Sequence, residues 1–168
     1  MTTNTNNRNT NSMNSNSMVN SRADTQTLDT KFLTEAAQGG MAEVELGKLA
    51  AAKAQNPEVK KFGQKMVDDH SKANAELKDL ATKKNLSLPT EVNSEQKSLM
   101  EKLGKLTGAE FDKAYVDAMV DDHEEDVEAF KDESTDGKDA DAKAWALKTL
   151  PTLQTHLDMI KAIQSKMK

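Results

Sequence analysis

A pentapeptide that ends in histidine occurs twice in this chain, as Met66-Val67-Asp68-Asp69-His70 and as Met119-Val120-Asp121-Asp122-His123. The third histidine is His156. Imidazole nitrogens bind divalent transition metals and also act as general acids and bases. Because the 168 residues include no cysteine, thiolate ligands, disulfides and cysteine nucleophiles are excluded. A metal site in this chain would therefore use histidine, aspartate, glutamate or water.

The apolar pattern around each histidine turns it toward the inside of a helical bundle. Within residues 57–84, apolar side chains recur at intervals of three and four, and His70 takes one of these positions. His123 continues an equivalent stripe within 109–133, and His156 lies at the edge of a third stripe near the C-terminus. All three side chains are predicted to point at or near the bundle interior.

A helix predicted over residues 30–55 adds a carboxylate at a similar height. Glu43 lies in a small or apolar row of this helix, with a glycine a turn away on either side. Glycine inside a helix costs about 1 kcal/mol relative to alanine, so the two glycines suggest that neighbouring side chains need the room. If the first two helices are antiparallel through the Asn56-Pro57 turn, Glu43 and His70 lie 13 and 14 residues from that turn and come level.

The heights of the other two histidines decide whether all three meet. His123 lies about 14 residues into its helix, near mid-height, whereas His156 lies 18 residues from the last turn, about one helical turn off level. Each buried polar group needs a partner of its own. Inward histidines together with a level glutamate therefore favour a shared ligand.

We predict that one divalent ion binds here, with zinc as the first candidate, followed by iron, manganese, copper or nickel. The predicted ligands are Glu43, His70, His123 and His156. Four protein ligands would make a closed structural site, whereas a site without His156 would keep an open position. The alternative is a metal-free helical interaction module in which the same buried cluster has only a structural role.

Other side chains near the histidines are predicted to lie outside this set. Asp69 and Asp122 point off the apolar stripes, which favours solvated or capping roles. Asp126 has two open interpretations, an inward carboxylate or an exposed one, and Glu35 is a weaker candidate ligand. The methionines on or beside the stripes are expected to fill the core rather than to bind metal: Met66, Met119 and Met159.

The rest of the sequence predicts an all-α fold. The chain contains three prolines and lacks the alternation of β-branched residues that strands show. Long helices are predicted over 30–55, 57–84, 109–133 and 139–168, with a short helix over 93–107 in the crossover between the second and third. This pattern predicts an antiparallel four-helix bundle over 28–168, after a disordered tail over 1–27 that is rich in Asn, Thr and Ser. Pro151 should kink the last helix without ending it.

Charge and hydropathy exclude two classes of partner. The chain has 23 Lys and Arg against 28 Asp and Glu, and its arginines, Arg8 and Arg22, both lie in the N-terminal stretch, so no nucleic-acid surface is predicted. No apolar run approaches the roughly 18 residues that a membrane span needs. A protein partner or a homo-oligomer stays open.

Several separate blocks of the sequence resemble one family. Phe32–Gly47, Asn56–Lys60 with Met66–His70, and Thr149–Leu153 with His156–Leu157 are similar to an exported bacterial ferritin-like family labelled as a domain of unknown function, DUF4142. The resemblance implies a ferritin-like four-helix bundle in the periplasm or cell envelope, made with a signal peptide that this chain lacks. A role in stress or metal handling would fit that location. The positions that match the family pattern include the predicted ligands Glu43, His70, His123 and His156.

The chain departs from true ferritins at the metal ligands. A di-iron carboxylate site needs Glu-x-x-His on two helices, but the residues three before the histidines are Val67, Val120 and Leu153. Ferroxidase chemistry is therefore not expected, and a redox enzyme is the last of the three hypotheses. No nucleophile elbow, P-loop, Rossmann fingerprint or His-Glu-x-x-His motif occurs, so no sequence motif indicates an enzyme.

Overall fold

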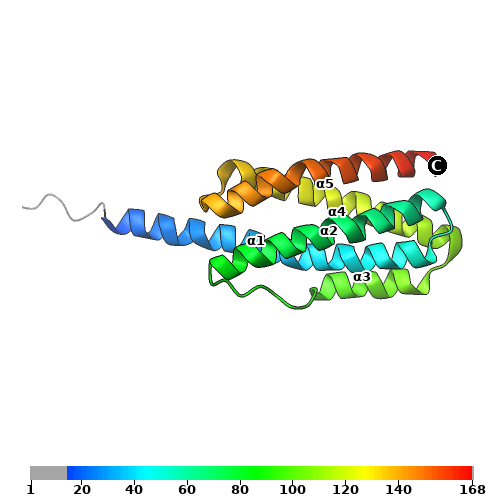
Figure 1. The fold of residues 1–168 in the computed structure, drawn as a ribbon, viewed down its shortest axis with the longest axis horizontal. Coiled ribbons are helices and arrows are strands. Elements are labelled where there is room, and N and C mark those ends of the chain that lie inside the picture. Colours follow the sequence, from blue (N-terminus) through cyan, green and yellow to red (C-terminus); the bar gives the residue numbers. More distant parts are fainter. Residues whose placement is uncertain (1–14, 168) are drawn as a thin grey trace, which may run out of the picture.

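The protein is an antiparallel bundle of four long helices with a fifth, short helix in the crossover (Figure 1). The structure, a computed structural model, describes the backbone of residues 15–167 and the side chains of residues 29–167. In chain order the helices are α1 (Ser15–Lys53), α2 (Pro57–Lys83), α3 (Ser94–Lys105), α4 (Gly108–Asp136) and α5 (Ala140–Lys166). Two hairpins, α1–α2 and α4–α5, pack against each other, and α3 lies in the connection between them. The predicted all-α bundle is confirmed.

The helix ends differ from the predicted ones at two places. The α1 helix begins at Ser15 rather than near Thr30, and its first part projects beyond the bundle (Figure 1). No glycine or proline between Ser15 and Gln38 would stop a helix there. Residues 15–27, which the sequence assigned to a disordered tail, thus belong to α1, whereas residues 1–14 lie outside the described part of the chain and a disordered tail there stays a prediction. At the other place, α4 continues to Asp136 instead of ending near Glu133.

Local sequence explains where three of the helices start. The Asn56 side chain accepts a hydrogen bond from the backbone N–H of Glu58, and Pro57 occupies the first turn of α2, where its missing N–H costs nothing. Asn93 caps α3 in the same way, and Asp139 caps α5. Pro151 lies inside α5, which continues past it.

Two buried aspartates tie each hairpin turn to the opposite hairpin. Asp112 of α4 accepts hydrogen bonds from two backbone N–H groups of the α1–α2 turn, at 3.0 and 2.7 Å. Asp29 of α1 accepts from the α4–α5 turn, with a shortest distance of 2.6 Å. Hydrogen bonds to charged groups contribute about 1.5–3 kcal/mol, so these contacts help to set the register between the two hairpins.

The core consists of two apolar clusters, one toward each end of the bundle. The first contains Phe62, Met66, Tyr115 and Met119 with their neighbours, and the second centres on Leu77, Phe130 and Trp145. Met66 and Met119 are fully buried, and Met159 packs against the first cluster. The prediction that these methionines fill the core is therefore confirmed.

Two glycines of α1, Gly40 and Gly47, serve the packing of α1 against α2. An added Cβ at Gly47 would lie 2.6 Å from the carbonyl oxygen of Gly63, and one at Gly63 would lie 2.7 Å from that of Gly47. A Cβ at Gly40 would collide with the amide of Asn74 on α2. The room that the sequence indicated around Glu43 is thus used by the close approach of two helices.

Candidate metal centre

A single polar layer separates the two apolar clusters, and each long helix contributes one residue to it. On every long helix, this residue follows the last member of one cluster and precedes the first member of the other. The four residues are Glu43, His70, His123 and His156, with exposed fractions of 1%, 5%, 0% and 0%. The structure therefore brings together the four side chains that the helical stripes selected.

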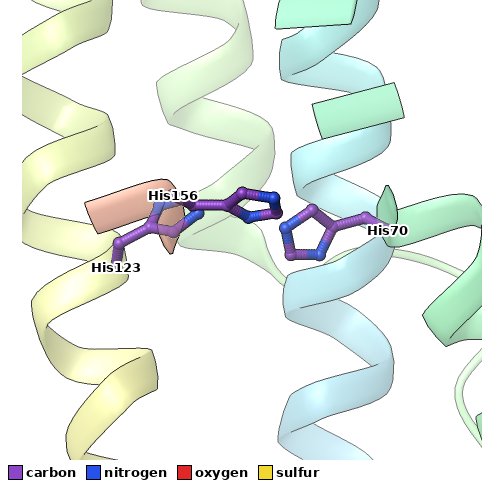
Figure 2. A group of neighbouring side chains, drawn as sticks. All are labelled: His70, His123 and His156. Carbon is purple, nitrogen blue, oxygen red and sulfur yellow. The ribbon is translucent and has the colours of Figure 1, made fainter. Parts of the chain in front are cut away.

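The three imidazole rings face one another across the centre of this layer (Figure 2). Ring centroids are 5.3 Å apart for His70 and His156, 5.5 Å for His123 and His156, and 5.9 Å for His70 and His123. One nitrogen of each ring lies within 4.8 Å of one nitrogen of each other ring. In Figure 2 the ring of His70 turns one nitrogen toward the ring of His156.

Hydrogen bonds hold His70 and His123 from the outside of this triangle. His70 Nδ1 lies 2.7 Å from Glu43 Oε2, and an ionised Glu43 accepts the Nδ1–H there. His123 Nδ1–H donates to the carbonyl oxygen of Met119 at 2.9 Å, which leaves the proton on Nδ1 because a carbonyl can only accept. Both contacts orient the ring and assign its free nitrogen, as outer partners of metal-binding histidines do.

Asp69 holds the third ring, which corrects the prediction that this residue is solvated or caps a helix. His156 Nε2–H donates to Asp69 Oδ2 at 2.7 Å, and Lys65 contacts the same oxygen at 2.8 Å. Burial by itself would raise the pKa of Asp69, but the hydrogen bonds from Lys65 and His156 outweigh it and lower that pKa. Helical periodicity could not reveal this role, because Asp69 reaches sideways from α2 to a residue of α5.

The three remaining nitrogens are buried and have no hydrogen-bond partner among the described residues: His70 Nε2, His123 Nε2 and His156 Nδ1. An unpaired buried acceptor costs about 1–3 kcal/mol, so native proteins seldom keep several together. This layer has three in one place. The other nitrogen of each ring, which points outward, already has a hydrogen-bond partner. The free lone pairs therefore all lie inside the bundle.

Burial keeps the imidazoles neutral. Burial lowers the pKa of His123 to about 3, and the neighbouring His70 and His156 contribute to this lowering. The hydrogen bond to Met119 acts in the opposite direction. Burial likewise lowers the pKa of His156 to about 4, although Asp69 opposes it. The pKa of His70 is also lowered by burial, against the charges of nearby aspartates. Neutral imidazoles are the form that binds metal.

Glu43 belongs to a second group, with Asp122 and His123, in which one ligand atom of each residue lies within 4.8 Å of the others. Its free oxygen, Oε1, is 3.4 Å from His123 Nε2 without forming a hydrogen bond. Burial, with the Asp122 charge, raises the pKa of Glu43 well above its ordinary value. Burial also raises the pKa of Asp122 to about 6. Asp122 therefore faces the site, and the prediction that it points away is wrong.

The two remaining candidate carboxylates, Asp126 and Glu35, lie in different environments. Asp126 is half-buried, and its pKa is raised by burial and by the charges of Glu43 and Asp122, which places it near the layer. The inward interpretation of Asp126 is the one that the structure supports. Glu35 is exposed and pairs with Lys31 at 3.5 Å, so it takes no part in the site.

His156 lies level with the other imidazoles, although the sequence count placed it one helical turn away. Because α4 continues to Asp136 and α5 begins at Ala140, His123 lies 13 residues before the end of α4 and His156 lies 16 residues after the start of α5. A difference of three residues is less than one helical turn. The longer α4 therefore removes most of the expected mismatch.

Three solved structures share this fold at low sequence identity. A DUF305 fragment from Deinococcus radiodurans is 10% identical, with a TM-score of 0.73 over 83% of this chain and 96% of that chain. A DUF305 protein from Streptomyces coelicolor, described as a candidate secreted protein, is 13% identical, with a TM-score of 0.70 over 83% and 93% of the two chains. CopM in the Cu(II)-bound form is 14% identical, with a TM-score of 0.70 over 83% and 97%. These likenesses establish the helical bundle fold.

Sequence comparison identifies the family. No curated protein matches the sequence of this chain. The family described as "Domain of unknown function (DUF4142)" matches residues 14–163, which is most of the chain. The resemblance carried by the separate sequence blocks is confirmed, and the chain belongs to the DUF4142 family.

Proposed function

We propose that this protein binds a single transition-metal ion, in a non-catalytic role, through the three imidazoles of the polar layer. The observation that carries the proposal is that three buried nitrogens, His70 Nε2, His123 Nε2 and His156 Nδ1, have no partner among the described residues, in three rings that each bring one nitrogen within 4.8 Å of the other two. Three lone pairs directed at one point are the arrangement that a metal ion satisfies. Histidine triads of this kind occur in known metal centres.

Other occupants satisfy this arrangement less well. A water molecule has two hydrogens to donate, so one of three acceptor nitrogens would stay unpaired. A proton on one ring is opposed by burial, which lowers the pKa of His123 to about 3 and that of His156 to about 4. A metal-free polar cluster, the alternative interpretation, therefore needs a third donor, and the group available for it is a protonated Glu43, whose Oε1 lies 3.4 Å from His123 Nε2.

Glu43 is the proposed fourth ligand. Its Oε2 is engaged by His70, whereas Oε1 is free and lies 3.4 Å from His123 Nε2. Ligand atoms about 2.0–2.1 Å from a tetrahedral ion are themselves about 3.3 Å apart, so this separation suits two ligands of one ion. The carboxylate would also offset part of the charge of a divalent ion, which a buried site requires.

Copper is the first candidate metal, and zinc, which the sequence favoured, is the second. Imidazole suits zinc, copper, iron and nickel, and among divalent ions of the first row copper binds most strongly to a given nitrogen site. A structural neighbour, CopM, is described in a Cu(II)-bound form. Direct competition between Cu²⁺ and Zn²⁺ for the purified protein discriminates between the two metals.

Metal analysis of tag-free protein tests the proposal. The three histidines all lie in the polar layer and the chain has no cysteine, so few other strong sites compete. We expect one Cu²⁺ or Zn²⁺ per chain by mass spectrometry of the metal content. Substituting His70, His123 or His156 by alanine should abolish stoichiometric binding, while Asp68→Asn, an exposed neighbour, should retain it. Absence of stoichiometric metal in the wild type would favour the metal-free interaction module, and binding that survives all three histidine substitutions would overturn the assignment of the ion to the imidazoles.

We place the protein outside the cytoplasm, in the periplasm or cell envelope, with metal handling or stress as its setting. The neighbour from Streptomyces coelicolor is described as a candidate secreted protein, which supports this location. None of the described helices has both the length and the apolar character that a membrane span requires. Cell fractionation with an antibody against the protein, from its native host, tests the location directly.

A further inference from the structure

A small polar groove runs between α2 and α5 beside the metal centre. Its volume is about 110 Å³, and it is lined by residues of α2 (Asp69, Lys72, Ala73 and Glu76) and of α5 (Lys148, Thr149 and Thr152). A water molecule occupies about 30 Å³ in the liquid, so the groove has room for a few waters. It is therefore wide and polar enough for a hydrated path.

The groove leads to the one histidine partner that solvent reaches. The side chain of Asp69 is 31% exposed, yet its Oδ2 contacts the fully buried His156 at 2.7 Å. The other two rings are held by a buried glutamate and a backbone carbonyl, and apolar clusters close the layer on both sides along the bundle. Asp69 is thus a polar link between the surface and the three imidazoles.

The contacts that bound the groove are weak enough to open. Lys65 holds Asp69 at 2.8 Å, and Lys148 bridges the groove to Glu76 at 2.9 Å. Both lysines keep an exposed part, 35% for Lys65 and 66% for Lys148. Ion pairs at such exposure contribute about 0–1 kcal/mol each, so either can open without disturbing the bundle.

We propose that metal ions enter and leave the centre through this groove, with Asp69 as the residue that receives the ion before the imidazoles. This inference rests on the proposed function. The Asp69 carboxylate is paired with Lys65, so it attracts a cation once that pair opens, and rotation of Asp69 away from Lys65 keeps the ion next to His156. Asp69 acts here as a positioning residue for His156 and as the first carboxylate that the ion meets.

Blocking the groove tests the route by its kinetics. Thr152 is exposed and lines the groove, so Thr152→Phe should fill the space without touching the core. Stopped-flow mixing with Cu²⁺ should show association slowed at least tenfold, and chelator-driven dissociation should slow by the same factor. A block of the path leaves Kd unchanged. Thr155→Phe, an equally exposed position of α5 outside the groove, should leave both rates as in the wild type.

A charge substitution gives an independent test. Asp69→Asn keeps an oxygen that accepts from His156 but removes the charge, so association should slow several-fold and lose part of its salt dependence. Asp68→Asn removes the same charge one residue away and should change neither.

If Thr152→Phe leaves the association and dissociation rates unchanged, the route is overturned, while the proposed metal binding stands. The route is also overturned if Thr152→Phe weakens affinity with an unchanged dissociation rate. Absence of stoichiometric metal in the wild type would instead overturn the proposed function, and the route with it.

Discussion

Replacing His123 by leucine should stabilise the metal-free protein and destroy its metal binding. His123 is fully buried beside Phe62, with ring centroids 6.1 Å apart, and its Nε2 has no partner among the described residues. Its other nitrogen donates to the Met119 carbonyl, which lies inside α4 and keeps its helical hydrogen bond when the side chain is removed. Leucine has a similar size and leaves no polar atom in that place.

The expected gain follows from two opposing effects. Removing an unpaired buried acceptor recovers about 1–3 kcal/mol, and losing the bond to Met119 costs about 0.5–1.5 kcal/mol. We expect a net gain of about 1 kcal/mol in the free energy of unfolding, which for a domain of this size raises Tm by about 2–4 °C. With metal at a hundred times its Kd, the wild type gains about 2.7 kcal/mol and the variant gains little, so the order of stability reverses.

Thermal and urea unfolding, each with chelator and with Cu²⁺ or Zn²⁺, measure this reversal. His70→Leu is the matched control, because it leaves Glu43 Oε2 buried without its partner at 2.7 Å. That variant should be less stable than His123→Leu by about 1–3 kcal/mol in chelator. A loss of 1 kcal/mol or more for His123→Leu in chelator would refute the reasoning, because it would mean that the imidazole cluster is satisfied without metal.

Three further predictions follow from the same structure. Gly63→Ala should lower the free energy of unfolding by about 1–3 kcal/mol, because its Cβ would lie 2.7 Å from the Gly47 carbonyl oxygen. Gly104→Ala in α3, where an added Cβ would have nothing within 4 Å, should raise it by about 0.5–1 kcal/mol. Urea unfolding of the two variants measures both effects. Asp112→Ala should cost about 1.5–3 kcal/mol and hasten hydrogen exchange at the α1–α2 turn. In chelator, the difference in the free energy of unfolding between His123→Leu and the wild type should grow as pH falls below about 6.5, by up to about 1.4 kcal/mol per pH unit. The reason is that His123 takes up a proton in the unfolded chain at these pH values, whereas burial lowers its pKa in the folded protein to about 3. An advantage that stays constant between pH 7 and pH 5 would contradict this last prediction.

The sequence predicted the bundle and the inward histidines because both depend on local periodicity. Apolar residues at intervals of three and four define one face of each helix, and His70, His123 and His156 occupy positions on or beside that face whatever the other helices do. Proline and asparagine at residues 56–57 locate a turn by steric and capping effects that involve only neighbouring residues. These features are properties of single helices, so the sequence alone determines them.

Contacts between helices were decided by the tertiary structure. Periodicity placed Asp69 and Asp122 off the stripes, but the packing of α2 against α5 brings Asp69 to His156, and Asp122 comes close to Glu43 and His123. The height of His156 depended on where α4 ends, and helix ends are the least local part of such a prediction.

Which imidazole nitrogens remain without a partner depends on both the sequence and the tertiary structure. Residue types supply three imidazoles, and the hydrogen bond on the far side of each ring, to Glu43, to the Met119 carbonyl and to Asp69, determines which nitrogen remains available. Those partners belong to another helix in two of the three cases. The sequence alone therefore determined that polar groups would meet inside the bundle, whereas the crossing and register of the helices decided that they meet as three unpaired acceptors suited to a metal ion.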